Sequence, residues 1–226
     1  MSDATKRSIL RWIHLIVVGH EDPMQRQGKI VPYGCAARNL VHSPARIPHA
    51  TVQIIPVRCG TRNVFIHQRS KKVRTSPGAW DILGGHVAFE MALLSSPSSL
   101  SEASMTTALR EAREEMLLKV DGKPYLIQQK DFKQVGEVGQ FTCDEPKNVE
   151  YSTAFVLCIP NRAVVSDSPF EYRDGTVEWL PVSEIRWDDL LNNYKVKKSA
   201  EFADGISRIL EHALISVDIE HIIDQC

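Results

Sequence analysis

The sequence predicts a mixed fold of the α/β (α+β) class, a sandwich in which helices lie among β-strands. Three observations indicate it: β-branched runs recur along the chain, segments with helical spacing lie among them, and no internal repeat is visible. The 226 residues are 43% hydrophobic and 24% charged, which is typical of a globular protein and excludes a disordered or collagen-like chain. A chain of this length can fold without a disulfide or a structural metal.

Residues 1–48 are predicted to form an N-terminal extension that packs on a domain formed by residues 49–226. The extension contains an apolar run, 9–18, which Arg11 and His14 interrupt. The run is too short to span a bilayer, and no small-residue cleavage site follows it. It therefore predicts a buried strand or helix rather than a signal peptide or a membrane span.

The charge balance and the cysteine content indicate which binding partners and which cellular compartment to expect. The 27 Lys and Arg nearly balance the 28 Asp and Glu, and the net charge of −1 argues against polymeric nucleic acid or an anionic membrane as the main partner. No cysteine pair has CxxC spacing, and the odd number of cysteines favours a reducing, cytoplasmic location over a disulfide framework. The five cysteines are Cys35, Cys59, Cys143, Cys158 and Cys226.

Strands are predicted where β-branched and apolar residues run together. The predicted strands are 51–57, 64–67, 135–141, 151–159 and 176–180. A basic loop from Arg69 to Arg74 and the turn Pro77-Gly78 precede Trp80. Near the C-terminus, residues 183–191 and 199–214 have helical patterns.

A long helix is predicted to start at Ser99, after a serine-rich loop. Ser99 and Glu102 have the spacing of a capping box. Apolar residues then recur at i, i+4, i+7 and i+11, which predicts one buried stripe. The stripe consists of Met105, Leu109, Ala112 and Met116.

The side of this helix away from the stripe is predicted to be acidic. Glu111, Glu114 and Glu115 fall within about 100° of arc, and Arg110 lies one turn before Glu114. In water, two like charges ~4 Å apart repel by only about 1 kcal/mol, so an isolated pattern of this kind favours a solvated face. On a partly covered face the repulsion is about 4 kcal/mol, and Mg²⁺ or Mn²⁺ is the natural compensation.

Three motifs follow one another along the chain. Gly85 ends a strand, the run Arg110-Glu111-Ala112-Arg113-Glu114-Glu115 lies on the predicted helix, and Glu178-Trp179-Leu180-Pro181 precedes a further helix. Their order resembles the Nudix hydrolase family, and the run 110–115 matches the centre of that family's box. The resemblance spans about residues 50–215. It implies an α/β/α sandwich with a mixed sheet, whose box helix holds Mg²⁺ or Mn²⁺. Family members cleave a diphosphate linked to another moiety, often a nucleoside.

The resemblance also implies roles for individual residues. Glu111, Glu114 and Glu115 would bind metal or position the attacking water, and Arg110 would orient these carboxylates. The further metal-ligand candidates are the Gly85 carbonyl and Glu150. The candidate substrate-binding residues are Arg69, Lys72, Trp80 and His86. Each candidate outside the box has a structural alternative: a strand-edge charge for Glu150, a solvated loop for Arg69 and Lys72, a strand position for His86 and a core position for Trp80.

The sequence departs from the family's box in two places. Gly85 lies 17 positions before Glu102, so the loop carries an 11-residue insertion, and either Glu90 or Glu102 fills the first acidic position. Leu117 stands where the box has a later glycine. The helix is therefore predicted to run on to about Lys119 and to end at Asp121-Gly122.

One branch of this superfamily, isopentenyl-diphosphate isomerase, is also similar. The likeness lies in residues 67–70 and 77–81, in His42 and His49, and in Glu150, which falls where that branch has a metal-binding Glu. That isomerase protonates its substrate with a Cys beside the strand that here is 82–85. No Cys lies between Cys59 and Cys143, so an isomerase-like hydrolase is predicted.

The predicted function is Mg²⁺- or Mn²⁺-dependent cleavage of the diphosphate bond in a nucleoside diphosphate linked to another moiety, or in a related organic diphosphate. The partner is a small molecule, and the oligomeric state, a homodimer included, is left open. Two alternatives are kept. One is a non-catalytic nucleotide-binding module, which would usually have lost box carboxylates, and the other is an isomerase-like enzyme.

Overall fold

The computed structural model describes residues 13–21, 28–41, 47–87, 99–143, 148–172, 174–197, 201–216 and 218–226. It divides the chain into two compact units. The first comprises residues 1–52, 85–107 and 137–153, and the second comprises residues 53–84, 108–136 and 154–226. The elements that run from one unit into the other are β3 (His49–Arg58), β6 (Leu83–His86), α3 (Ser99–Glu115), β9 (Phe132–Cys143) and β10 (Asn148–Ile159).

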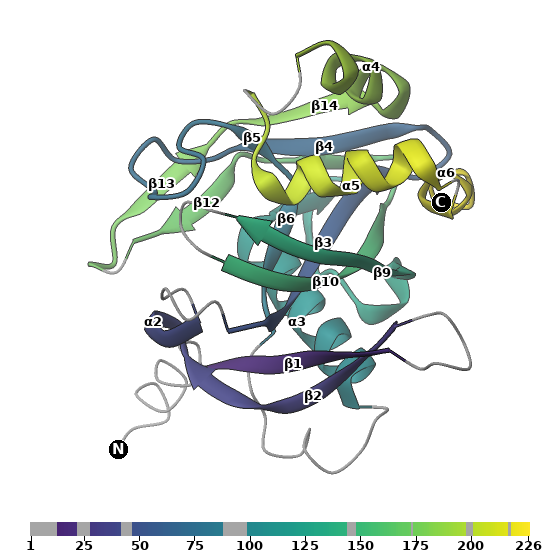
Figure 1. Cartoon of the computed structure of the whole chain (residues 1–226). Helices are drawn as coiled ribbons and strands as arrows, with labels where there is room; N and C mark the ends of the chain where they lie inside the picture. The colour runs from purple at the N-terminus through teal and green to yellow at the C-terminus, as the bar shows by residue number, and fades with distance from the viewer. Residues whose placement is uncertain are drawn as a thin grey trace. The chain divides into compact units, whose positions relative to one another are not determined.

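The first unit begins with an antiparallel hairpin of β1 (Ile13–Glu21) and β2 (Gly28–Ala37), followed by α2 (Arg38–Val41) (Figure 1). The hairpin register shifts between Ile16 and Val17, and Val17 pairs with Pro32. Proline has no N–H to donate, and a break in the ladder is where a strand tolerates it. The apolar run at 9–18 is thus a strand from Ile13 onward, and residues 9–12 lie outside the described residues.

In the second unit, β4 (Asn63–Gln68) has three partners. It pairs antiparallel with β3 at Val64↔Val57, with β14 (Val182–Arg186), and with the short β5 (Trp80–Asp81). Two smaller sheets accompany it. One contains β7 (Leu118–Val120), β8 (Lys123–Tyr125) and β11 (Ala163–Val165), and the other contains β12 (Ser168–Glu171) and β13 (Val177–Leu180). A 3₁₀ turn, η2 (Gln129–Asp131), precedes β9.

Three helices complete the second unit: α4 (Trp187–Lys197), α5 (Asp204–Ile215) and α6 (Asp218–Asp224). In α5 the buried apolar residues are Ile206, Ile209, Leu210 and Ala213, which is the i, i+3, i+4, i+7 stripe of a helix that packs on a core. In the part of the chain that the structure describes, every helix is too short or too polar for a membrane span. The predicted mixed α+β class is confirmed.

Two predicted C-terminal helices begin in the wrong place. Residues 183–186 are a strand, because they continue the antiparallel pairing of β14 with β4, and the helix starts at the buried Trp187. The second helix starts at Asp204 rather than near 199. The N–H of Trp80 donates to the Glu201 carbonyl and the N–H of Ala203 donates to the Trp80 carbonyl, so this segment pairs like a strand with Trp80. The sequence patterns did not predict α6.

The box helix α3 ends at Glu115, four residues before the predicted end at Lys119. Asp121 and Gly122 have consecutive positive φ values of 52° and 78°, which makes them the tight turn of the β7–β8 hairpin and not a helix cap. Ala112 is buried as the stripe predicts, and Met116 is buried just beyond the helix end. Met105 and Leu109 are only half-buried.

The structure also corrects the expectation that the cysteines form no disulfide. Cys158 on β10 and Cys226 at the C-terminus are bonded, with their Cα atoms 5.5 Å apart and 68 residues between them in sequence. Cysteines so far apart in sequence have no recognisable spacing, and only the fold brings them together. Cys35 and Cys59 are free thiols.

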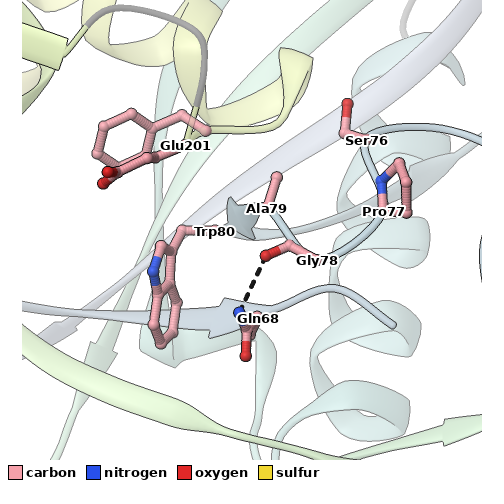
Figure 2. A pocket seen from close by; sticks show the side chains of 8 residues that line it. Gln68, Ser76, Pro77, Gly78, Ala79, Trp80 and Glu201 are labelled. Atoms are coloured by element: carbon pink, nitrogen blue, oxygen red, sulfur yellow. Dashed lines mark hydrogen bonds between the residues drawn. The ribbon is translucent and has the colours of Figure 1, made fainter. Parts of the chain in front are cut away.

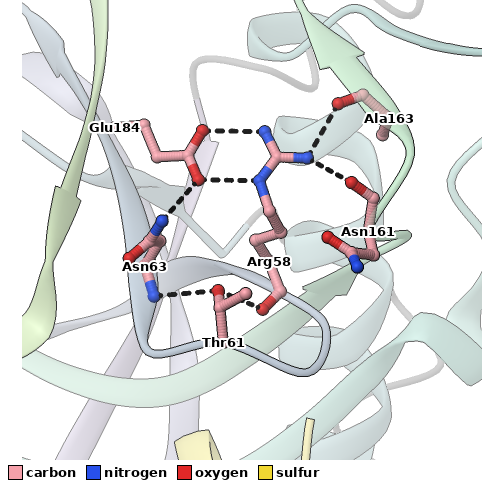
Figure 3. A network of polar contacts seen from close by, with 6 residues as sticks. All are labelled: Arg58, Thr61, Asn63, Asn161, Ala163 and Glu184. Atoms are coloured by element: carbon pink, nitrogen blue, oxygen red, sulfur yellow. Dashed lines mark hydrogen bonds and ion pairs between the residues drawn. The ribbon is translucent and has the colours of Figure 1, made fainter.

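Arg58, at the end of β3, connects three segments of the second unit (Figure 3). Its Nε and Nη2 donate to the two carboxylate oxygens of Glu184, each at 2.7 Å. Its Nη1 donates to the carbonyls of Asn161 and Ala163 at 2.7 and 2.9 Å. The side chains of Arg58 and Glu184 are mostly buried, at 16% and 30% exposed. This bidentate ion pair therefore contributes more to the stability of the protein than a surface ion pair does.

Replacing Arg58 with Met is expected to lower the free energy of unfolding by about 1–3 kcal/mol at neutral pH. The hydrogen bond from Arg58 is the main reason that the pKa of Glu184 lies below its usual value. The contribution is therefore present above the unfolded-state pKa of about 4.3 and is lost as the pH falls through the lower folded-state pKa. Urea unfolding at several pH values checks this. Arg186→Met, at an exposed side chain with one 3.5 Å contact to Asp188, is the control, and an equal loss in both variants would contradict the prediction.

Candidate active site

The C-terminal end of α3 gathers three carboxylates around one guanidinium. Arg110 donates from Nη1 to Glu114 at 3.0 Å, one helical turn on, and from Nη2 to Glu111. Glu114 is exposed, whereas the side chain of Glu111 is only 12% exposed. Arg110 thus contacts two of the carboxylates, and its role in orienting them for catalysis stays a prediction.

Glu115 is half-buried as a residue, and it differs from the other two because one of its carboxylate oxygens is fully buried. Its Oε2 atom is inaccessible to solvent and has no hydrogen-bond partner among the described residues. Burial raises the pKa of Glu115 well above its usual range, and the nearby Glu111 and Asp81 carboxylates raise it further. A backbone hydrogen bond from Gly84 and the charge of Arg69 act in the opposite direction without compensating the burial. A buried carboxylate beside two others is the arrangement that a divalent cation stabilises.

The glycine contact of Glu115 comes from Gly84, one residue before the predicted Gly85. Gly84 and Gly85 are consecutive in β6, and a ligand role for the Gly85 carbonyl stays a prediction. The acidic side of the helix is therefore not uniformly exposed, as the helical arc suggested. The reason is that Glu115 is the last residue of α3, next to the strands of the second unit, and not in the middle of an open helix face.

Asp81 is a member of this cluster that the sequence patterns missed. It is buried on β5 and accepts a 2.8 Å hydrogen bond at Oδ2 from Arg69. Its Oδ1 accepts from the backbone N–H groups of Ile82 and of Ile206, in the first turn of α5. The available signal was an acidic residue at the edge of an apolar strand. Arg69 donates hydrogen bonds to Asp81 and to the Thr75 carbonyl. It therefore adds positive charge to the carboxylate cluster and also holds the loop 69–75 in place.

The loop with Lys72 is anchored by a small polar network. Ser70, which is buried, accepts from the Lys72 N–H and donates to Glu178, and Tyr172 donates to the same carboxylate. These bonds hold the pKa of Glu178 below its usual value. The Lys72 ammonium lies 5.1 Å from the centre of the Tyr172 ring, in an exposed position where an anion can reach it.

A second group of possible ligands lies in the first unit. His49 on β3, His86 on β6 and Glu150 on β10 each offer a ligand atom, and these atoms lie within 4.8 Å of one another. The two imidazole rings stack with centroids 5.0 Å apart, and their Nε2 atoms lie 3.8 and 3.7 Å from Glu150 Oε1. We refer to these three residues as the His–His–Glu cluster.

The strands around this cluster hold its members on one face. Thr51 and Ser152 are buried and share a hydrogen bond between their hydroxyls, and each follows a cluster member by two residues along its strand. Residues two apart in a strand point to the same side, so His49 and Glu150 face the same way as this pair. The Val87 N–H donates to the Ala50 carbonyl at 2.9 Å, which aligns His86 with β3.

The hydrogen bond that His49 makes at Nδ1 favours metal binding at its Nε2 atom. The Ile47 carbonyl can only accept, so the 3.1 Å contact places the proton of a neutral His49 on Nδ1. The lone pair of Nε2 then faces the carboxylate of Glu150, and a cation between them would satisfy both. A metal-binding histidine usually has such a backbone acceptor on its second nitrogen. From the sequence, Glu150 was a metal-ligand candidate and His86 a substrate-binding candidate, whereas His49 had been noted only for its resemblance to the isomerase branch.

Comparisons with known proteins identify the family of the chain. A family model of the NUDIX domain matches residues 47–202, more than half of the chain, and the chain belongs to this family. As a Nudix hydrolase it acts on diphosphate bonds. A comparison with curated proteins finds no match.

Several solved structures are similar. A NUDIX hydrolase from Alicyclobacillus acidocaldarius is 13% identical, with 77% of this chain and 94% of that chain covered and a TM-score of 0.48. The MutT protein from Methanosarcina mazei Go1 is 18% identical, with coverages of 73% and 91% and a TM-score of 0.45. DR0079 from Deinococcus radiodurans is 14% identical, with coverages of 88% and 97% and a TM-score of 0.49. Similarities this distant carry no information on substrate.

Proposed function

We propose that the chain uses Mg²⁺ or Mn²⁺ to cleave the diphosphate bond of a nucleoside diphosphate linked to another moiety, or of a related organic diphosphate. The observation that supports this most is the buried Glu115 carboxylate, whose Oε2 has no partner among the described residues and which lies near Glu111 and Asp81. A divalent ion held there would neutralise the carboxylates and the diphosphate and would lower the pKa of a bound water.

The residues of the box helix have separate roles in this proposal. Glu111 and Glu115 would hold the ion, and Glu114 would either join them or accept a proton from the attacking water. Arg110 is a positioning residue, because its guanidinium is already occupied by Glu111 and Glu114. The Gly85 carbonyl is proposed as a further ligand. Lys72, and Arg69 to the extent that Asp81 leaves it available, attract the anionic substrate.

The His–His–Glu cluster is proposed to hold a second divalent ion. Two imidazoles and one carboxylate suit Mn²⁺ better than Mg²⁺, which prefers oxygen ligands. Glu150 at this place agrees with the isomerase-like branch, and membership of that branch stays a prediction. In the described part of the chain no cysteine lies near β6 in sequence to act as the isomerase acid, which favours hydrolysis.

A substrate panel assayed with Mg²⁺ and with Mn²⁺ tests this function. We expect phosphate-ester products from at least one nucleoside diphosphate sugar, dinucleotide coenzyme or prenyl diphosphate, and no reaction in the presence of EDTA. Running the reaction in ¹⁸O-labelled water identifies the phosphorus that water attacks. Tight binding of a panel member with no turnover would indicate a binding module instead, and migration of a double bond would indicate an isomerase. The small-molecule substrate, the cytoplasmic location, the domain boundary at residue 49 and the homodimer stay predictions.

A further inference from the structure

We propose that Asp81 is a positioning residue that holds the guanidinium of Arg69 in place for the phosphates of the substrate. Its buried carboxylate joins Arg69 to the first turn of α5, in the second unit. Asp81 itself touches neither the metal nor the substrate. The inference rests on the hydrolysis proposed above and extends it to a residue outside the box helix.

The carboxylate of Asp81 is buried, yet donors of the protein itself compensate its charge. Its Oδ2 accepts from Arg69 Nη1 at 2.8 Å, and its Oδ1 accepts from the N–H groups of Ile82 at 3.0 Å and Ile206 at 3.3 Å. Ile206 lies in the first turn of α5, where the helix dipole also favours a negative charge. Glu115 differs, because its Oε2 has no partner in the described part of the chain. A cation would therefore stabilise Glu115 more than Asp81.

Arg69 has donors left after its bond to Asp81. A guanidinium carries five N–H groups in a rigid fork. One of them donates to Asp81, and another donates from Nε to the Thr75 carbonyl at 3.2 Å, which leaves three without an acceptor among the described residues. The side chain of Arg69 is 29% exposed, so an anion can reach these donors. Two parallel N–H groups are what a bidentate contact with a phosphate requires.

Arg69 and Asp81 both lie within electrostatic range of the carboxylates on α3. Burial raises the pKa of the Glu115 carboxyl group, the charges of Glu111 and Asp81 raise it further, and the charge of Arg69 acts against them. Arg69 is thus near the residue that is proposed to hold the ion. A phosphate that the ion attracts can therefore also accept hydrogen bonds from Arg69.

Asp81 is itself held by the elements around it, as a positioning residue must be. In the ladder between β4 and β5 it lies opposite His67. The helix α5 approaches it so closely at Gly205 that a Cβ there would lie 3.2 Å from Asp81 Oδ1 and 2.8 Å from Gln53 Oε1. Any residue other than glycine at this position would displace one of these side chains.

The backbone of Arg69 is also fixed before any ligand arrives. Its N–H donates to the Ala79 carbonyl at 2.8 Å. The preceding residue, Gln68, donates from Nε2 to the Gly78 carbonyl at 3.0 Å, as the dashed line in Figure 2 marks. A guanidinium that is fixed through its backbone and through Asp81 avoids much of the entropic cost of ordering it on binding.

Trp80, a substrate-binding candidate from the sequence, lies on the other side of β5. Trp80 and Asp81 are consecutive residues of this strand, so their side chains point to opposite sides. The half-buried indole lines a cavity of about 600 Å³ together with Gln68 and the loop 76–79 (Figure 2). Neither Asp81 nor Arg69 is among the residues that line it. Of the two residues of β5, Asp81 is therefore the one that acts on the carboxylate cluster.

A double-mutant cycle on the binding of methylene diphosphonate, a diphosphate analogue that water does not cleave, tests the proposal. Calorimetry at saturating Mg²⁺ compares the unaltered chain with Asp81→Asn, Arg69→Gln and the variant that carries both. Asn keeps the shape of Asp81 and can still accept from the two backbone N–H groups, but it loses the charge-assisted bond to Arg69. Each single substitution should weaken binding about tenfold, roughly the loss of one hydrogen bond to a charged group.

The double variant should bind no more weakly than Arg69→Gln alone, because Asp81 acts only through Arg69. The direction of the Asp81→Asn effect is informative too. Removing a negative charge would by itself strengthen the binding of an anion, so a loss of affinity indicates that Arg69 has left its position. Arg69→Lys should lose as much affinity as Arg69→Gln, because a single ammonium paired with Asp81 cannot form the fork.

Asp131→Asn is the matched control. Asp131 in η2 also accepts from a backbone N–H, that of Gln128 at 2.8 Å, and from a side chain, Tyr125 at 3.0 Å. This variant should bind the diphosphonate like the unaltered chain, and thermal unfolding in EDTA establishes that each variant is folded.

Three outcomes would overturn the inference alone while the unaltered chain binds the diphosphonate. They are unchanged affinity in a folded Asp81→Asn variant, a double variant whose loss is the product of the two single losses, and full affinity in Arg69→Lys. The last of these decides the matter even if Asp81→Asn does not fold. No binding by the unaltered chain would overturn the proposed function together with this inference, so the two failures are distinguishable.

Discussion

Replacing Glu115 with Gln should lower kcat by at least about two orders of magnitude while leaving the protein as stable as before or more so. Gln has nearly the same shape and can still accept the hydrogen bond from Gly84, but it removes a charge that is buried beside Glu111 and Asp81. Removing an uncompensated buried charge does not destabilise a metal-free protein. Steady-state kinetics at saturating Mg²⁺, together with thermal unfolding in EDTA, measure both effects.

The opposite direction of the two effects makes this experiment decisive. Substituting a residue that only supports the fold would lower the stability and the activity of the protein together. Substituting a metal-binding carboxylate lowers the activity alone. Glu171→Gln, at an exposed carboxylate at the end of β12, is the matched control and should change neither quantity. Activity near that of the unaltered chain in Glu115→Gln would remove Glu115 from the site. Glu102→Gln can be assayed in parallel, because Glu90 lies outside the described residues and the first acidic position of the box is still open.

The second large effect is expected on metal affinity, from the substitution His86→Asn in the His–His–Glu cluster. The variant removes one of three ligand atoms that lie within 4.8 Å of one another, so Mn²⁺ should bind at least about tenfold more weakly. Titration with Mn²⁺ alone, followed by electron paramagnetic resonance, measures this loss without any substrate. Glu150→Gln should weaken binding similarly, because it removes the charge that both imidazoles face.

His221→Asn is the control for that titration. His221 is exposed on α6, in the second unit, and its Nε2 contacts Gln225 at 2.8 Å. Its substitution should not change the affinity for Mn²⁺. If His86→Asn binds Mn²⁺ like this control, the cluster is only a packed pair of histidines with a carboxylate nearby, and the proposal of a second ion fails.

Local sequence patterns correctly predicted the helices and strands that local residue preferences determine. The β-branched runs 51–57, 64–67 and 151–159 all form strands, namely β3, β4 and β10. Alternating or continuous apolar side chains pack well on the face of a sheet. The start of α3 at Ser99 also agrees, because a Ser with Glu three residues later is a signal of a helix start. Residues 183–186 were assigned wrongly for the converse reason. Their local pattern suits a helix, and the free edge of β4 makes them a strand.

The same distinction applies to the candidate site. Helical pitch alone places Glu111, Glu114 and Glu115 on one side of α3 with Arg110 among them, so the sequence by itself determined the carboxylate cluster and the family that it resembles. Only the tertiary structure decided that a carboxylate oxygen of Glu115 is buried, that Asp81 joins it from β5, that His49 and His86 meet Glu150, and that Cys158 is bonded to Cys226. The physical reason is that spacing along one helix is a property of the local backbone, whereas burial and contacts between distant strands depend on how the whole chain packs.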